Sequence, residues 1–188
     1  MTKRNPTDAA TLGLHLLVLR CQAGDDRAFT QLMQQFGTRT LGYLRGLVGD
    51  SADDVQQEVW LAVYRGIASV ANPAAFRTWL YRTTRHRAVD FLRKQKRERE
   101  LIADVPLETA MNVEQDTSTE GSMTEAMLDA MPQLTATQRE VLLLRYQEDM
   151  SYAEIALVLA CPIGTVRSRL RAAKDRLLHL VRHERLPG

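Results

Sequence analysis

The chain has 188 residues, enough for one large or two small domains, and 45% of them are hydrophobic, which is ample for real cores. Its two cysteines, Cys21 and Cys161, exclude a disulfide framework, and no cysteine spacing typical of a metal site occurs. A membrane-spanning run and a signal-peptide pattern are also missing, so we expect a cytosolic protein with no cofactor, no metal and no membrane insertion.

Charge is distributed unevenly, although the formal net charge is only +2. Residues 77–99 contain nine Lys or Arg against two acidic residues, and residues 162–188 contain seven against two. Between them, residues 100–131 contain eight Asp or Glu and no basic residue. Basic segments of this density are typical of proteins that bind a polyanion; solvated helix faces are the alternative interpretation.

Helical periodicity dominates the first hundred residues. Apolar residues recur at spacings of three and four in four segments, which predicts helices over 12–23, 28–48, 53–67 and from 76 onward. Ser51 is a candidate N-cap for the third helix, with acidic residues in its first turn. No period-two strand pattern of convincing length occurs, so the expected fold class is all-α.

Composition changes after residue 100. Residues 101–122 show little periodicity and contain Pro106 and Gly121, which predicts a mobile linker. Two small helical domains joined by a flexible acidic linker are therefore expected.

Helix boundaries are marked clearly in the second domain. Two capping boxes, Thr135 with Gln138 and Ser151 with Glu154, predict helix starts just after Thr135 and Ser151. Pro162 suits the first turn of a last helix. We expect about four helices, of which the last two form a helix-turn-helix.

The last helix has the pattern of a DNA-reading element. Arg167, Arg171 and Lys174 share one face beside Ser168, away from the apolar stripe. The N-terminal part of such a helix enters the major groove, where Arg can pair with guanine and hydroxyl groups can hold phosphate. A charged outer face of an ordinary amphipathic helix is the alternative.

The earlier basic segment interleaves aromatic and cationic side chains on one helix, which suits single-stranded nucleic acid. Its residues are Arg77, Trp79, Tyr81, Arg82, Arg85, His86 and Arg87. For Trp79 alone, a place in the core is favoured.

A catalytic site is not apparent in the sequence, so no enzyme is expected. Asp54 with Glu58, and His86 with Asp90, have the i,i+4 spacing of metal ligands but lack a third ligand. Surface ion pairing or solvation explains them better. Cys161 adjoins the turn below an apolar helix and is expected to pack in a small core.

Three stretches together carry a family resemblance: DDVQQEVWLAVYR (53–65), FRTWLYRTTRHRAVDFLRK (76–94) and MSYAEIALVLACPIGTVRSRLRAAKDRL (150–177). In order and spacing they resemble the bacterial extracytoplasmic-function (ECF) sigma factors of the sigma-70 family, which are promoter-recognition subunits of RNA polymerase. The resemblance implies sigma region 2 over 12–99, an acidic linker over 100–123 and sigma region 4 over 124–185.

The resemblance also implies residue roles. Contacts to the clamp helices of the polymerase β′ subunit would come from Asp54, Gln57, Glu58 and Trp60. The −10 promoter element, melted and with one base flipped out, would be held by Asn72, Arg77, Tyr81, Arg82, Arg85 and His86. The −35 element would be bound as duplex by Arg145, Tyr152, Gly164, Thr165, Arg167, Ser168 and Arg171. Gln56 departs from the family, which usually has an apolar residue there.

The partners implied are core RNA polymerase (β′ clamp helices and β subunit), promoter DNA and an anti-sigma factor. The acidic linker would thread the RNA channels of the polymerase, whose walls are basic; a disordered tether, or a segment that folds back on the basic helices, are the alternatives. The alternative function is a stand-alone helix-turn-helix transcription regulator, which has no need for the 53–65 motif followed by a basic aromatic helix.

Overall fold

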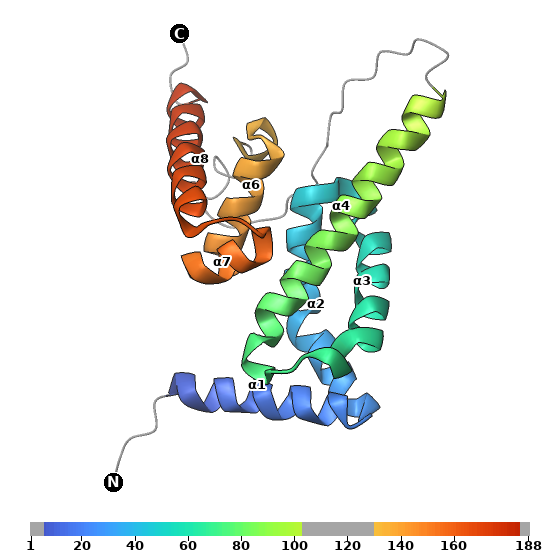
Figure 1. The fold of residues 1–188 in the computed structure, drawn as a ribbon. Coiled ribbons are helices and arrows are strands. Elements are labelled where there is room, and N and C mark those ends of the chain that lie inside the picture. The colour runs from blue at the N-terminus through green and yellow to red at the C-terminus, as the bar shows by residue number, and fades with distance from the viewer. Residues whose placement is uncertain (1–5, 103–129, 185–188) are drawn as a thin grey trace.

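The computed structural model describes residues 6–102 and 130–184, and within them the protein is all-α, as predicted (Figure 1). The first part consists of α1 (Pro6–Gln22), α2 (Asp26–Val48), α3 (Ala52–Gly66) and α4 (Phe76–Ile102), with the short 3₁₀ turns η1 (Gly49–Ser51), η2 (Ile67–Ser69) and η3 (Pro73–Ala75). The second part consists of η4 (Met131–Gln133), α6 (Ala136–Leu142), η5 (Leu143–Gln147), α7 (Tyr152–Leu159) and α8 (Ile163–Glu184). The predicted acidic linker falls almost entirely on residues 103–129, outside the described part.

In the first part, α2, α3 and α4 pack side by side, and α1 crosses one end of them (Figure 1). Their shared core is aliphatic and aromatic, and its fully buried members include Leu32, Val59, Phe76 and Leu80. Each such side chain contributes roughly 1.5–3 kcal/mol on burial. Gln56 fits this core because its Nε2 donates to the Gly37 carbonyl (2.6 Å) and to the Thr40 hydroxyl (3.2 Å).

The caps of these helices agree only partly with the sequence patterns. Asp25 caps α2, since its Oδ1 accepts from the backbone N–H groups of Arg27 (3.0 Å) and Ala28 (3.1 Å). Ser51 precedes α3 as predicted, but its side chain makes no capping hydrogen bond. The reason is the 3₁₀ turn η1, which already runs into the helix and whose last residue is Ser51.

In the second part, both predicted capping boxes are present and α6 and α7 begin at Ala136 and Tyr152, directly after Thr135 and Ser151. The apolar stripe of α8, including Val166, Leu170 and Ala173, is buried as predicted. The described residues of this domain hold three α-helices, and the stretch from Leu143 to Gln147 continues α6 as a π-helical turn. The expected count of about four also covers residues 124–129, which lie outside the described part.

The turn between α7 and α8 carries local backbone strain. Ala160 ends α7 in the left-handed region, at φ 50° and ψ 48°, where a Cβ atom is unfavourable. Replacing Ala160 by glycine is therefore expected to raise the free energy of unfolding by roughly 0.5–1 kcal/mol, measured by urea denaturation. Ala172→Gly in the middle of α8 is the matched control and should lower it by about 1 kcal/mol. Destabilisation by Ala160→Gly would contradict the assignment of strain.

The two parts pack directly against each other, α7 on α4 and α6 with η5 on α2 (Figure 1). Tyr43 and Tyr81 of the first part are fully buried in the same apolar cluster as Val141 and Leu144 of the second. Tyr81, which the sequence assigns to the −10 element, therefore lies inside the contact between the two parts.

Candidate nucleic-acid interface

The helix-turn-helix has the predicted form. Ser151 and Glu154 fix the start of α7 through reciprocal hydrogen bonds of 3.2 and 2.8 Å. After the turn, the Pro162 carbonyl accepts from the N–H groups of Thr165 (2.9 Å) and Val166 (3.2 Å), so Pro162 opens the first turn of α8. The buried stripe of α8 packs on α6 and α7 and leaves the opposite face free of contacts with them.

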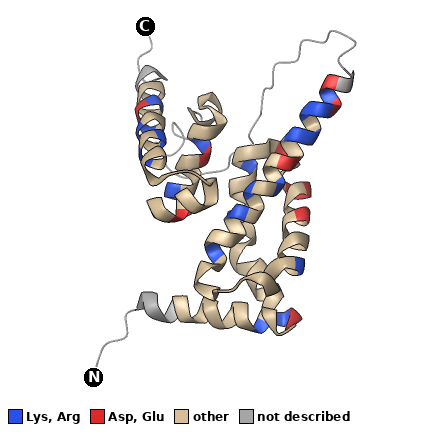
Figure 2. Ribbon diagram, viewed as in Figure 1, with Lys and Arg blue, Asp and Glu red and all other residues tan. Residues whose placement is uncertain are grey.

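The side chains predicted to read duplex DNA lie together at the start of α8. Gly164, Arg167, Ser168 and Arg171 are exposed and Thr165 is half-buried. The Arg171 side chain is 87% exposed, and its nearest acid, Asp175, is 3.9 Å away. Such a pair is weak in water, so this guanidinium is available to an anionic ligand. Figure 2 shows the basic residues along α8.

Arg145 and Tyr152, the predicted phosphate contacts, also meet each other. The Arg145 guanidinium lies 5.8 Å from the centroid of the Tyr152 ring and donates to the Met150 carbonyl (2.8 Å). Asp149 is 3.6 Å from the same guanidinium. These contacts hold Arg145 at the entry to α7 and leave the Tyr152 ring partly exposed beside it.

The loop before α4 is held from two sides. Asn72 is exposed, and its Oδ1 accepts from the Ala74 N–H (2.9 Å), which caps the turn η3. On the inner side, Nε2 of Gln22 donates to the carbonyls of Ile67 (3.0 Å) and Val70 (2.8 Å). Gln22 was not singled out from the sequence because its partners lie far along the chain.

The predicted −10 contacts on α4 are divided between two environments. Arg82 and His86 are exposed, and Arg77 is half-buried. Tyr81 is fully buried, and Arg85 is half-buried because its Nε donates to Oε1 of Glu140 (2.9 Å). The structure therefore presents part of this set to solvent and covers the rest with the second domain.

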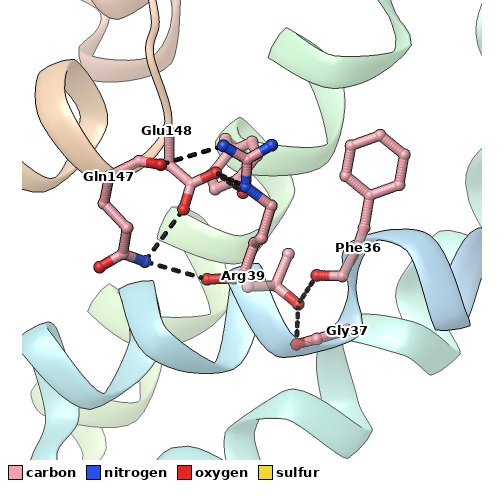
Figure 3. A network of polar contacts seen from close by, with 7 residues as sticks. Phe36, Gly37, Arg39, Gln147 and Glu148 are labelled. Carbon is pink, nitrogen blue, oxygen red and sulfur yellow. Dashed lines mark hydrogen bonds and ion pairs between the residues drawn. The ribbon is translucent and has the colours of Figure 1, made fainter. Parts of the chain in front are cut away.

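The covering contacts centre on two acids. The Oε1 atom of Glu140 accepts from the Tyr43 hydroxyl (3.0 Å) as well as from Arg85, and the Tyr81 hydroxyl donates to Oε2 of Glu148. The Glu148 side chain is completely buried and lies 3.4 Å from Nε of Arg39. Figure 3 shows Glu148 with Arg39 and Gln147, whose Nε2 donates to Oε1 of Glu148 (3.0 Å).

Electrostatics keeps the two tyrosines in their donor form. Burial, together with the neighbouring carboxylates of Glu140 and Glu148, raises the pKa of Tyr43 and of Tyr81 well above the usual value. Both hydroxyls therefore stay protonated at any physiological pH and donate to the carboxylates. Nothing in the sequence pattern pointed to Arg39, Tyr43, Glu140 or Glu148.

The predicted polymerase contacts lie on α3. Asp54, Gln57 and Glu58 are exposed on one face, and Leu61 continues it one turn later with 49% of its surface exposed. Leu61 was missed, although an apolar residue outside the stripe of Val55, Val59 and Val63 was a usable signal. Trp60 does not join this face.

The Trp60 ring points into the core instead. Only 7% of Trp60 is exposed, and its ring meets Phe29 edge-to-face at a centroid distance of 6.0 Å. In this structure the Trp60 ring packs in the core and helps to hold α3 in place. Trp79, for which a core place was favoured, is half-buried and packs on Phe76 (6.1 Å between centroids).

The described residues contain neither a metal-ligand cluster nor a membrane-spanning helix. Over residues 6–102 and 130–184, no three His, Cys, Asp or Glu side chains come together as a metal site. In the same residues, no helix has the length and apolar character needed to cross a membrane. Cys161 is half-buried at the edge of the second core, in partial agreement with the core packing expected of it.

Comparison with known proteins connects these surfaces to a family. Residues 32–98 match the family Sigma-70 region 2, and residues 124–177 match Sigma-70, region 4. The RNA polymerase sigma-H factor of Pseudomonas aeruginosa is 37% identical over 172 residues, covering 85% of this chain and 89% of the relative. The ECF RNA polymerase sigma-E factor of Haemophilus influenzae is 34% identical over 171 residues, covering 85% and 90%.

Solved structures agree with this assignment. The sigma factor RpoE from Bartonella quintana, in complex with the anti-sigma factor NepR, is similar with a TM-score of 0.68 and 26% identity over 84% of this chain and 98% of that one. CnrH, in complex with the cytosolic domain of CnrY, shares the fold with a TM-score of 0.64 and 24% identity, covering 90% and 97%. The chain belongs to the ECF sigma factors of the sigma-70 family.

Proposed function

We propose that this sigma factor binds core RNA polymerase through α3 and directs it to promoters by reading the −10 element with residues 12–99 and the −35 element with residues 124–185. Residues 100–123 serve as the linker between these regions. The protein acts in the cytoplasm as a transcription initiation factor rather than as an enzyme.

The observation that carries the proposal is the free start of α8. The start of α8 exposes the guanidinium groups of Arg167 and Arg171 and the hydroxyl of Ser168. The opposite side of the helix is buried in the hydrophobic core of the domain. An α-helix presented in this way fits the major groove, where each Arg can bond guanine O6 and N7. Arg145 and Tyr152 flank it and would hold the phosphate backbone.

The exposed face of α3 supports polymerase binding. Two carboxylates, Asp54 and Glu58, stand beside the amide of Gln57 and the apolar Leu61 on a single helix face. An apolar centre with charged neighbours is the composition of a specific protein interface. A stand-alone DNA-binding regulator would not need this exposed face of α3.

An anti-sigma factor is the proposed negative regulator. The similar Bartonella sigma factor was solved with the anti-sigma factor NepR. Both domains of this chain expose apolar side chains, such as Leu61, Leu157 and Ile163. A protein partner could bury these side chains on binding.

Co-elution with bacterial core RNA polymerase tests the proposal. The purified chain, freed of any bound anti-sigma factor, should co-elute with core polymerase lacking sigma at moderate salt, and added competitor DNA should not release it. Loss of co-elution with a competent polymerase would favour the stand-alone helix-turn-helix regulator instead.

A further inference from the structure

An exposed aromatic ring lies beside the basic face of α8. Tyr146 belongs to η5, the π-helical turn that follows α6, and 57% of its surface is exposed. The ammonium group of Lys174 lies 5.4 Å from the centroid of the Tyr146 ring. Lys174 follows Arg171 by three residues and Arg167 by seven, so it continues the exposed basic face of α8. Tyr146 therefore contacts the third cation of that face.

A second cation–aromatic pair lies close to the first. Arg145, next to Tyr146 in the chain, lies 5.8 Å from the centroid of the Tyr152 ring. The two pairs also influence each other: interaction with the Tyr146 hydroxyl is the main cause that raises the pKa of Lys174, Tyr152 raises it further, and Arg145 lowers it. The four side chains therefore form one cluster, which includes Arg145 and Tyr152, the two residues proposed to hold the phosphate backbone.

The charge of Lys174 is not offset by an acid. Over residues 6–102 and 130–184, no carboxylate forms an ion pair with Lys174, whereas Asp149 lies 3.6 Å from Arg145 and Asp175 lies 3.9 Å from Arg171. A cation–π contact between exposed side chains stabilises a folded chain only modestly. The ammonium group is thus held in place while its charge remains available to an anionic ligand.

The place of Lys174 along α8 suits a phosphate rather than a base. The N-terminal turns of a recognition helix enter the major groove, and Lys174 lies two turns beyond Arg167, about 10 Å farther along the helix axis. Because the major groove is only about 12 Å wide, a side chain at that distance is expected beside the strand at the edge of the groove. An ammonium group binds phosphate as a point charge.

We propose that Lys174 is a further phosphate contact of the −35 duplex and that Tyr146 is the residue that positions it. This inference rests on the proposed role of α8 in reading the duplex. A lysine side chain loses rotamer freedom when it is fixed on a ligand. The Tyr146 ring already restricts Lys174 in the free chain, and such preorganisation increases affinity without adding a contact to the ligand.

Binding of the full chain to fluorescent duplex DNA, measured by anisotropy over a range of salt concentrations, tests both parts of the inference. The probes are a duplex that the wild-type chain with core polymerase selects from a random pool, and a duplex of random sequence. Lys174→Gln should reduce the dependence of log K on log salt by about 0.9, the value of one phosphate contact. Its affinity at about 0.1 M salt should fall roughly fivefold to tenfold on both duplexes.

Tyr146→Ala tests the positioning role, because it leaves every charge in place. It should lower the affinity for both duplexes by about threefold, the cost of fixing a lysine side chain that is no longer held. In a chain that already carries Lys174→Gln, it should have no further effect, since Tyr146 acts only through Lys174. The matched charge control is Arg176→Gln, which removes one exposed cation from another face of α8 and should leave the salt dependence unchanged.

Two results would overturn the inference while the proposed function stands. An unchanged salt dependence for Lys174→Gln, on a duplex that the wild type binds, means that Lys174 does not contact phosphate. Equal losses from Tyr146→Ala with and without Lys174 mean that Tyr146 touches the DNA itself and positions nothing. The proposed function fails separately: if Arg167→Ala with Arg171→Ala binds the selected duplex like the wild type, α8 does not read the duplex, and the inference is refuted with it.

Discussion

Alanine at both Arg167 and Arg171 is expected to lower the affinity for the −35 duplex by about a hundredfold or more. Both side chains are exposed on the side of α8 that is proposed to face the major groove. Each bidentate arginine–guanine pair contributes about 1–3 kcal/mol of discrimination. Because the stripe of Val166, Leu170 and Ala173 is untouched, the helix itself should remain folded. The effect therefore belongs to recognition and not to stability.

The measurement requires a defined site. A duplex selected from a random pool by the wild-type protein with core polymerase supplies it, and fluorescence anisotropy at fixed salt gives the affinity, since salt changes every phosphate contact. Arg176→Ala is the matched control: this arginine is also exposed on α8 but lies beyond the N-terminal turns. Equal losses on the selected duplex and on a random duplex would show phosphate contact only and contradict base reading.

How much of this molecule follows from its sequence depends on the range of the interactions involved. The starts of α6 and α7 were predicted correctly because Thr135 with Gln138 and Ser151 with Glu154 act within one helical turn. The buried side of α8 was also predicted, since periodicity alone determines it. Local patterns were therefore sufficient for the elements and for the exposed start of α8.

The contact between the domains could not be predicted in the same way. Glu140 and Glu148 look like ordinary acids in sequence, and their partners Tyr43 and Tyr81 are 97 and 67 residues away. The position of Trp60 could not be predicted for the same reason. Trp60 lies beside the apolar stripe of α3, and its ring turns inward because it packs against Phe29 of another helix. Long-range packing overrides what a single helix face indicates.

Reversing both acids of the α3 face, with Asp54→Lys and Glu58→Lys, is expected to weaken binding to core RNA polymerase by about 30-fold to 1,000-fold. Loss of complementary charge at a specific interface costs about 2–4 kcal/mol, and every 1.4 kcal/mol is a factor of ten. Neither acid takes part in an ion pair that stabilises the described fold, whereas their neighbour Asp53 lies 3.9 Å from Arg45. Titration of fluorescently labelled chain with core polymerase measures the change.

The control must carry the same change in net charge elsewhere on region 2. Glu98→Lys with Glu100→Lys meets this condition, because both acids are exposed near the end of α4 and form only weak pairs with Lys94 (3.9 Å) and Lys96 (3.6 Å). This control variant should bind polymerase like the wild type. Leu61→Ala, which removes the apolar centre of the α3 face but no charge, should weaken binding on its own. Equal losses in the two charge-reversed chains would mean that net charge, and not the α3 face, determines the affinity.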